Sequence, residues 1–417
     1  MAKDSRIPKF YEKPVAERLG IVSEFAGLTD DDIAVLKKPG SLGIETANRM
    51  IENVISTHEL PLGIATNFVI NGKPYLVPMV LEEPSVVAAA SNAAKLAGSF
   101  EASSDEPVMI GQVLLVDVKK MPDAKKKILA AKKRLLEMAN ARDSVLVKFG
   151  GGAKGIEVKE VKFKSKKMLI VHLLVDVRDA MGANAVNTMC ETIAPELESL
   201  SGGIARMRII SNLAVYRKAR AKAVWKKEII GKETVDAVLD AYAFAAADVF
   251  RCATHNKGIM NGIDAVVLAT GNDFRAVEAG AHAFAAYGKG GYKPLTKYYS
   301  NKNGDLVGEI ELPMAVGLVG GATKTHPTAK IAVKILGVKT AKELSEVIVA
   351  VGLAQNFAAM RALSTEGIQR GHMKLHAKNI AIQAGAKGKK IEQIAARMAE
   401  EKNVSATRAK ELLGGTK

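Results

Sequence analysis

The run PVMIGQVLLVDV (107–118) opens the part of the chain that decides its fold. Its apolar, partly β-branched residues, bounded by Pro107 and a lysine-rich segment, predict a buried strand. PDAKKKILAAKKRLLEMANAR (122–142) has apolar residues at helical spacing and predicts an amphipathic helix. GIEVKEVKF (155–163) and KMLIVHLLVDV (167–177) predict two further strands joined by a basic turn.

This part ends with a second predicted helix, MGANAVNTMCETIAPELESL (181–200), and a last strand, ARMRIISNLAV (205–215). The order β-α-β-β-α-β is the ferredoxin-like split pattern. We therefore expect residues 109–215 to form a compact domain inserted into a larger one. GGGAKG (150–155) matches the dinucleotide fingerprint G-x-G-x-x-G, which needs a strand before it and a helix after it. Because a strand-like run follows, we interpret these glycines as a tight turn.

The larger domain contains LEEPSVVAAA (81–90), in which two carboxylates precede a proline and small apolar residues. Proline favours the first turn of a helix, so we expect a helix over 81–98 with Glu82 and Glu83 at its N-terminus. The backbone dipole is positive there and can hold a ligand. A charged first turn on an ordinary core helix fits the same pattern.

The flanking segments make the larger domain helix-rich. Residues 29–57 predict helices, and residues 60–80 predict two strands joined by an Asn71-Gly72 hairpin turn. Further on, ETVDAVLDAYAFAAADVF (233–250) predicts a helix, AVVLAT (265–270) reads as strand-like, and residues 341–370 predict a long helix or a helix pair.

From about residue 369 the chain predicts two amphipathic helices separated by Asn403-Val404-Ser405. A small charged unit attached through Gly371 is typical of a lid that closes over a site and excludes water, and a permanently packed helical tail fits equally well. His372 and His376 at its base would share one helix face. They have no H-E-x-x-H motif and no third ligand nearby, so a single general-acid histidine is favoured over a metal site.

Composition limits the classes of protein that the chain can belong to. Its 417 residues allow two or three domains and a large core. No run of about eighteen apolar residues indicates a membrane span, and the polar N-terminus has no secretion-signal core. Cys190 and Cys252 alone cannot build a disulfide framework or a metal cage. We therefore expect a cytoplasmic protein.

The net charge of +16 is compatible with a polyanionic partner, an anionic small molecule or a lysine-rich surface without a partner. A nucleic-acid-binding protein is therefore a distant alternative. Aromatic residues make up only 5% of the chain, and the predicted strands at 155–163 and 167–177 offer only Phe163 for base stacking.

THNKGIMNGIDAVVLATGNDF (254–274) is rich in polar groups between small residues. Asn261 lies four residues after Lys257, and Asp273 follows the strand-like run, a place where catalytic groups are common. A lysine near buried carboxylates can stay charged and stabilise an oxyanion, whereas a surface lysine and a turn aspartate are the alternative. Small residues between Asp179 and Asn184 would let a phosphate or ribose approach a helix N-terminus, or would form an ordinary cap.

Several motifs together resemble those of the class II 3-hydroxy-3-methylglutaryl-CoA (HMG-CoA) reductases, essentially over the full length. They are EEPSVVAAAS (82–91), DVRDAMGANAVNTM (176–189), THNKGIMNGIDAVVLATGND (254–273), LVGGATKTHP (318–327), GLAQNFAAMRAL (352–363) and EGIQRGHMKLHA (366–377). The resemblance implies two successive hydride transfers between a nicotinamide dinucleotide and the thioester carbon of HMG-CoA, giving mevalonate and CoA. Class II members run in either direction, depending on metabolism.

An α+β fold in three parts follows from this pattern and resemblance. The large helix-rich domain would comprise residues 1–108 and 216–368, and the inserted ferredoxin-like, dinucleotide-binding domain residues 109–215. A helical C-terminal flap would comprise residues 369–417.

The resemblance assigns catalytic roles to Glu83, Lys257, Asp273 and His372. Lys257 would stabilise the oxygen that becomes anionic as hydride is transferred. Glu83 would donate a proton, with a pKa raised by like-charge repulsion from Asp273 beside it. His372 would protonate the departing CoA thiolate from the closing flap. No metal is implied.

Other residues match the binding positions of the family. Those of the substrate pocket are Ser85, Arg251, Asn261, Gln355 and Asn356, and those of the dinucleotide site are Asp143, Asp179, Met181, Gly182, Asn184 and Asn212. The carboxylate of Asp143 would prefer a free ribose 2′-hydroxyl, so we expect NADH to be preferred. Lys148 and Lys154 nearby act against this preference, and an NADPH-preferring biosynthetic form is the alternative.

Active sites of this family form between subunits, which implies a homodimer or a larger dimer-based assembly with no nucleic-acid or membrane partner. ENVIS (52–56) departs from the frequent ENVIG in a segment associated with dimerisation. Tyr11 stands where a relative has a basic residue for the CoA phosphate, and Lys9 and Lys13 could substitute for it. A CoA-thioester hydrolase, which would consume no nicotinamide, is a further rival.

Overall fold

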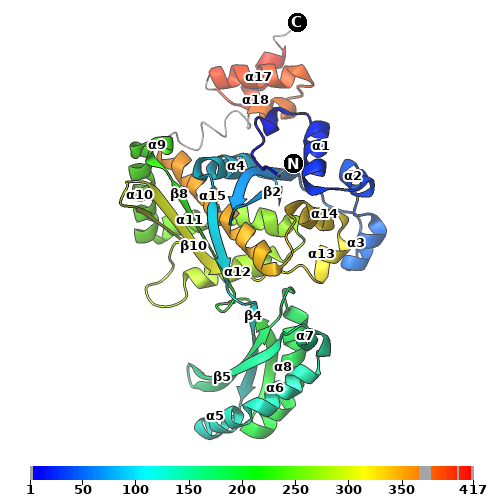
Figure 1. Ribbon diagram of the computed structural model, residues 1–417, viewed down its shortest axis with the longest axis vertical. Coiled ribbons are helices and arrows are strands. Elements are labelled where there is room, and N and C mark those ends of the chain that lie inside the picture. Colours follow the sequence, from blue (N-terminus) through cyan, green and yellow to red (C-terminus); the bar gives the residue numbers. More distant parts are fainter. Residues whose placement is uncertain (1–2, 366–376, 402, 415–417) are drawn as a thin grey trace.

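The computed structural model describes residues 3–365, 377–401 and 403–414. Figure 1 shows a large central part of the molecule, a smaller part below it and a helical C-terminal unit above it. Helices and two separate sheets confirm the α+β class that the sequence predicts.

The large domain contains a six-stranded sheet with the order β2-β1-β3-β8-β10-β9. Its neighbouring strands are antiparallel, except that β1 and β3 are parallel. The strands are β1 (Leu62–Ile70), β2 (Lys73–Val80), β3 (Phe100–Ser104), β8 (Lys218–Trp225), β9 (Thr296–Ser300) and β10 (Leu306–Pro313).

The hairpin between β1 and β2 confirms the predicted Asn71-Gly72 turn. Both residues have positive φ, 50° for Asn71 and 79° for Gly72. This is the left-handed backbone that a two-residue hairpin needs and that asparagine and glycine tolerate best.

The large domain also contains most of the helices. They are η1 (Phe10–Glu12), α1 (Val15–Ala26), α2 (Asp30–Lys37), α3 (Ile44–Met50), α4 (Val86–Ala97), α9 (Lys227–Ile230), α10 (Lys232–Ala247), α11 (Val249–Ala269), α12 (Phe274–Ala285), α13 (Gly321–Thr325), α14 (Pro327–Leu336) and α15 (Ala341–Ser364).

Helix α15 lies at the centre of this domain, against the sheet and helices α4, α10 and α11. Trp225 on β8 stacks on Phe357 of α15 with ring centroids 4.0 Å apart. Among the described residues, α15 alone is long and apolar enough to cross a membrane, but 67% of its most apolar window is buried inside the protein. Such burial is typical of a core helix.

The smaller domain has a four-stranded antiparallel sheet with the order β5-β6-β4-β7, which is the ferredoxin-like arrangement. Its strands are β4 (Val108–Val116), β5 (Gly152–Phe163), β6 (Lys166–Asp176) and β7 (Ile204–Ser211), and its helices are α5 (Met121–Ala130), α6 (Lys132–Ala141), α7 (Ser144–Lys148) and α8 (Ala183–Ser201). The chain passes through the GGGAKG glycines from helix α7 into strand β5, so the Rossmann arrangement is absent there.

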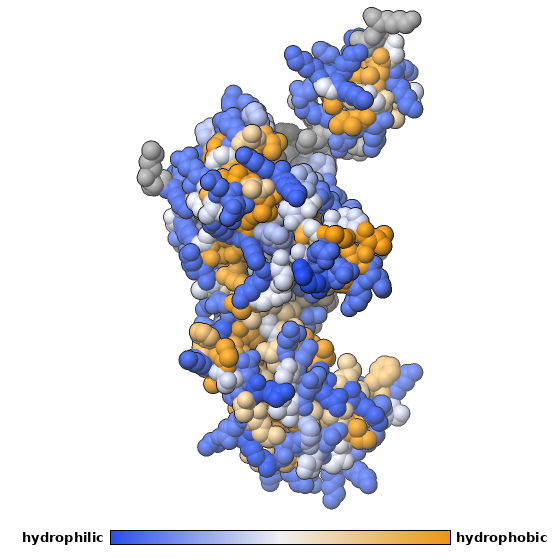
Figure 2. All heavy atoms as spheres, turned by 90° about the vertical axis from the view of Figure 1, so that its right-hand side faces the viewer, coloured by the Kyte–Doolittle hydropathy of each residue, from blue (hydrophilic) through white to orange (hydrophobic). Residues whose placement is uncertain are grey.

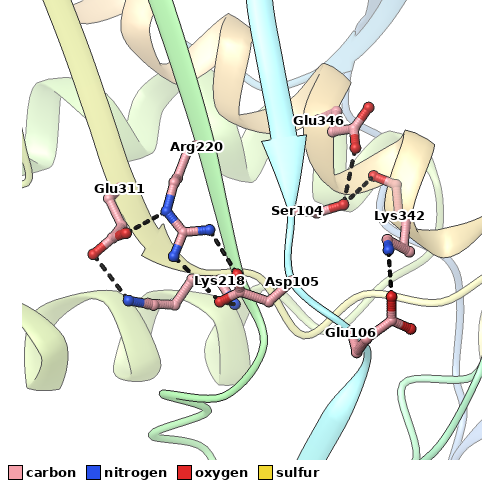
Figure 3. Close-up of polar contacts among 8 residues, drawn as sticks. All are labelled: Ser104, Asp105, Glu106, Lys218, Arg220, Glu311, Lys342 and Glu346. Carbon is pink, nitrogen blue, oxygen red and sulfur yellow. Dashed lines mark hydrogen bonds and ion pairs between the residues drawn. The ribbon is translucent and has the colours of Figure 1, made fainter.

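The chain enters the smaller domain after β3 and returns to the large domain before β8, and ion pairs surround this junction (Figure 3). Asp105 pairs with Arg220 on β8 at 2.7 Å, and Glu106 pairs with Lys342 on α15 at 2.8 Å. Arg220 also pairs with Glu311 on β10. The carboxylates of the outgoing linker are thus attached to the large domain.

The C-terminal unit has a small core of its own. Residues 377–383 are helical, followed by α17 (Lys389–Glu400) and α18 (Ala406–Gly414). These last two helices correspond to the predicted amphipathic pair on either side of residues 403–405. The three-part domain division remains our proposal.

Three local expectations are wrong. AVVLAT (265–270) is not a strand, because residues 249–269 form the single buried helix α11; a short apolar run does not distinguish the two structures. Pro84 precedes helix α4 rather than lying in its first turn, since the helix begins at Val86. The region after residue 216 contains strands β8, β9 and β10, which the sequence pattern did not reveal.

Candidate active site

Glu83 and Lys257, 174 residues apart in sequence, form an ion pair with Nζ and Oε2 3.0 Å apart. Glu83 lies in the short connection between β2 and α4, and Lys257 lies in the middle of α11. The connection is held close because β2 packs along α11. The structure therefore brings together the predicted catalytic acid and lysine.

Asn261 completes this cluster. It follows Lys257 by four residues on α11, so both side chains leave the same helix face. The Asn261 side-chain amide donates to the same Oε2 of Glu83 at 3.3 Å. Two donors thus orient one carboxylate oxygen.

Two predicted substrate residues have polar groups that are unused within the described structure. Ser85 caps helix α4 with a left-handed backbone (φ 74°), and its hydroxyl makes no hydrogen bond to the described residues. Gln355 is 5% exposed, and its Oε1 atom is buried without a partner there. Gln355 packs against Gly262, the residue next to Asn261, where a Cβ atom would lie 2.8 Å from the Gln355 Cβ. Free polar groups in this position are available to a ligand.

Two other predicted substrate residues do not join the cluster. Asn356 is 1% exposed and accepts hydrogen bonds from the hydroxyls of Thr296 and Tyr298, so its side chain links α15 to β9. Arg251 lies in the first turn of α11 and makes no hydrogen bond or ion pair with Glu83 or Lys257, all three being described residues.

Asp273 lies just beyond the C-terminal end of α11. It caps the N-terminus of α12, where its carboxylate accepts from the backbone N–H groups of Arg275 and Ala276, and it pairs with the Arg275 side chain at 3.1 Å. The backbone N–H of Asn272 donates to the carbonyl of Val267, and Val267 lies ten residues after Lys257 on α11. At 1.5 Å per residue this separation is about 15 Å along the helix. Within one chain, Asp273 is therefore not beside Glu83 and Lys257.

Asp273 instead lines a cavity of about 1400 Å³ where the large domain meets the smaller one. Four predicted dinucleotide residues line the same cavity, namely Asp143, Met181, Gly182 and Asn184. Asp179 and Asn212 are not among its lining residues: Asp179 accepts from the first backbone N–H of α15 (2.7 Å), and Asn212 is exposed on the returning linker.

The cavity has the features of an anion site. Gly182 has φ 101° and precedes the 19-residue helix α8, whose N-terminus opens toward the cavity. A Cβ atom at Gly182 would lie 2.5 Å from a Val177 methyl, so the backbone approaches its neighbours too closely for a side chain. Arg142 and Arg275 add positive charge to the lining. The sequence pattern singled out neither arginine, because an isolated arginine carries no motif.

Asp264 is a further carboxylate that the sequence pattern missed. It lies seven residues after Lys257, on the same face of α11. One of its oxygens is buried without a partner in the described structure. Burial, assisted by the negative charge of Glu278, raises the pKa of Asp264 to about 7.

The remaining catalytic prediction, His372, lies outside the described residues, as does His376. Among the described residues no group of three or more His, Cys, Asp or Glu side chains is placed to hold a metal ion. Cys190 and Cys252 are both buried and unpaired.

The sequence matches the family model described as hydroxymethylglutaryl-coenzyme A reductase over residues 14–377. It is 58% identical to the 3-hydroxy-3-methylglutaryl-coenzyme A reductase of Archaeoglobus fulgidus over 416 residues, covering 99% of this chain and 95% of that protein. A probable reductase of the same name from Borreliella burgdorferi is 38% identical and covers 79% of this chain and 77% of that protein.

Solved structures agree with these relatives. The class II reductase of Streptococcus pneumoniae, bound to NADPH in open conformations, superposes with a TM-score of 0.82 at 41% identity, covering 96% of this chain and 99% of that chain. Another structure of the Streptococcus pneumoniae reductase gives 0.84 at 40% identity, with 98% and 99% covered. This chain therefore belongs to the hydroxymethylglutaryl-coenzyme A reductase family, in its class II branch.

Proposed function

We propose that this reductase interconverts HMG-CoA with mevalonate and CoA in a four-electron reaction that uses two nicotinamide dinucleotides, with NADH preferred. The observation that carries the proposal is the Glu83–Lys257 pair with Asn261 beside it, close to the unused polar groups of the substrate residues. A bound dinucleotide would supply or accept hydride at the thioester carbon.

Lys257 is suited to stabilise the oxygen that becomes anionic during reduction. Its side chain is 59% exposed, so a substrate can reach the ammonium group beside Glu83. A cation held in place by a carboxylate does not need to reorganise when negative charge develops on the substrate. Glu83, whose carboxylate lies 3.0 Å from the Lys257 ammonium, would transfer a proton to that oxygen.

Asp273 enters this site only if a second copy of the chain supplies it, because α11 separates it from Lys257 within one chain. A site shared between subunits requires a dimer. Residues 51–61 form no helix or strand within the chain, and Ile51 and Ile55 of this region are 65% and 96% exposed. The flank that carries α1, α2 and α3 faces the viewer in Figure 2, where apolar side chains reach the surface of the large domain. We infer that a homodimer interface covers such side chains.

The cavity between the domains would hold the dinucleotide. The N-terminus of α8 behind Gly182 would face the pyrophosphate. Asp143 caps α7 by accepting from the Leu146 backbone N–H at 2.9 Å, which fixes its carboxylate at the cavity. That carboxylate favours a ribose 2′-hydroxyl, whereas the adjacent Arg142 would attract the 2′-phosphate of NADPH. The pneumococcal relative binds NADPH. An NADPH-preferring form of the enzyme is therefore the second candidate function.

The rest of the proposal concerns parts that lie outside the described structure. His372, on the segment that leads into the C-terminal unit, would protonate the CoA thiolate as that unit closes over the site. The proposal assigns no step to a metal. A cytoplasmic location is supported by the two unpaired, buried cysteines.

The direct test is a spectrophotometric assay of the purified protein. HMG-CoA should drive oxidation of NADH, and mevalonate with CoA should drive reduction of NAD, with slower rates for the phosphorylated dinucleotides. Lys257→Ala should lower both directions by about 100-fold or more, because it removes the oxyanion-stabilising charge. Nicotinamide-independent release of CoA would instead indicate a hydrolase.

Lys232 offers a matched control. It is also a helical lysine in an ion pair, with Asp236 at 2.6 Å, but both side chains are exposed at the first turns of α10. Lys232→Ala should keep wild-type rates. Full activity of Lys257→Ala would contradict the role of this lysine, and equal or faster rates with NADPH would contradict the NADH preference.

A further inference from the structure

Arg217 is a buried cation that makes no ion pair within the described structure, although the negative charges of Asp179 and Asp176 act on it. It is 4% exposed and lies at the end of the linker that returns from the smaller domain to β8. Its neighbours Lys218 and Arg220 are paired with Glu311 and Asp105 (Figure 3), whereas Arg217 forms no ion pair with any described residue. Burial lowers the pKa of Arg217 to about 10, so the group remains charged at neutral pH.

Among the residues that the structure describes, the Arg217 guanidinium donates only to backbone carbonyls. Nη1 bonds to the carbonyls of Ala180 and Met181, at 3.0 and 3.2 Å, and Nη2 bonds to the carbonyl of Val316. Burying a guanidinium is costly unless its donors are satisfied. The guanidinium has five N–H donors spread over a rigid planar fork, whereas the three donors of a lysine ammonium leave one atom and cannot reproduce that spacing.

The carbonyls of Ala180 and Met181 belong to the loop that leads into α8. Both residues, together with Gly182 and Asn184, line the cavity assigned to the dinucleotide. Arg217 is not among the lining residues, so it holds this loop without facing the cavity.

A second segment holds the same loop and extends to the catalytic aspartate. The Leu318 backbone N–H bonds to the Asp179 carbonyl at 2.8 Å. A Cβ atom on Gly317 would lie 2.4 Å from the Met181 backbone nitrogen, so the two segments are in contact. The Gly317 backbone N–H donates to the Asn272 side chain at 2.8 Å, and Asn272 precedes Asp273.

We propose that Arg217 is a positioning residue for dinucleotide binding, which fixes the Ala180–Gly182 loop and the N-terminus of α8 relative to the segment that holds Asn272. This inference rests on the proposed function, because it assumes that the dinucleotide occupies the cavity. Misplacing a binding group by about 1 Å can cost on the order of 100-fold. Loss of the guanidinium fork should therefore weaken the dinucleotide and leave CoA-ester binding at the Glu83–Lys257 cluster unchanged.

The test compares Arg217→Lys with Arg220→Lys, a matched change three residues away at an arginine whose partners are carboxylates. Calorimetric titration with NADH, NADPH and HMG-CoA gives Kd values without requiring turnover. For Arg217→Lys we expect the Kd of the preferred dinucleotide to rise about 10-fold to 100-fold, with the Kd of HMG-CoA changed less than about twofold. Arg220→Lys should leave both constants unchanged.

If Arg217→Lys does not fold, Gly317→Ala displaces the same loop from its other side and should give the same selective loss. Equal weakening of dinucleotide and HMG-CoA, unchanged dinucleotide binding in a folded Arg217→Lys protein, or an equal effect of Arg220→Lys would each overturn the inference. Failure of the wild-type protein to bind any nicotinamide dinucleotide would instead refute the proposed function.

Discussion

Shared active sites predict that two inactive variants restore each other. Lys257→Ala removes the oxyanion-stabilising charge, and Asp273→Asn removes the carboxylate that we assign to the partner subunit. Each homodimer should lose about 100-fold or more of its activity. A hybrid dimer, however, has one site that carries both substitutions and one site that carries neither.

The length of α11 and the statistics of subunit assembly together give the expected recovery of activity. About 15 Å of α11 separates Lys257 from Val267, whose carbonyl accepts from the backbone N–H of Asn272 beside Asp273. Lys257 and Asp273 of one chain would therefore contribute to different sites of the proposed dimer. Random assembly of equal amounts makes about half of the dimers hybrids, each with one intact site of two. The mixture should therefore reach about a quarter of wild-type activity, and hybrids purified through two different affinity tags should reach about half.

The chain offers a control in which no recovery is expected. Glu83 and Lys257 contact each other within one subunit. In a hybrid of Glu83→Gln and Lys257→Ala, each site therefore lacks one of the two groups, and the activity should stay at the level of the parents. Recovery in this control, or none in the Lys257–Asp273 hybrid, would refute the shared site.

Two further predictions concern stability. Asp264 has a pKa of about 7 when folded, above its ordinary value of 3.8, so the folded state holds the proton longer. The free energy of unfolding should therefore fall as pH rises from about 4 to about 7, and Asp264→Asn should abolish this fall. The pKa difference sets an upper limit of about 4 kcal/mol, and partial burial of the residue makes the effect smaller. Urea unfolding curves at several pH values test this, and parallel pH profiles for the two proteins would contradict it. Trp225 is fully buried against Phe357, and its ring N–H donates to the Ala93 carbonyl. Trp225→Ala should therefore lower the free energy of unfolding by about 3 to 5 kcal/mol. Circular dichroism during urea unfolding measures that loss, and a cost below about 1 kcal/mol would contradict the packing role.

The sequence predicted those elements whose signal is local. The Asn71-Gly72 turn needs only two adjacent residues with positive φ, and the order of elements between residues 107 and 215 follows from successive periodic runs. Thr29 likewise caps α2 (Asp30–Lys37) in a capping box with Asp32, inside the stretch 29–57 that predicts helices.

Elements that depend on tertiary contacts were not predictable in this way. Strand β8 reads KARAKAVW (218–225), in which every second residue is buried, but the buried residues are mostly alanines, which favour helices. AVVLAT has β-branched residues and is nevertheless helical, because α15 and the sheet bury that end of α11.

The Glu83–Lys257 cluster shows the same limit. No local pattern could indicate that Glu83 meets Lys257 across 174 residues, and only resemblance to a family pointed to the pair. The resemblance also predicted that Asp273 lies beside Glu83 and Lys257. Within one chain this prediction would require a break in α11, because the continuous helix carries Asp273 away from Lys257. The length of that helix could be read only from the structure.

The lysine clusters that contribute to the net charge lie away from the interdomain cavity. The lysine clusters at 125–127, 132–133 and 164–167 lie on α5, on α6 and in the β5–β6 turn with the first residues of β6, and none of these lysines lines the interdomain cavity. The cavity instead has single cations such as Arg142 and Arg275. The field of many lysines can raise the encounter rate with any anion, but it cannot select one. Selection requires a loop held in one position beside a helix N-terminus, and in this protein Arg217 and Gly317 hold that loop.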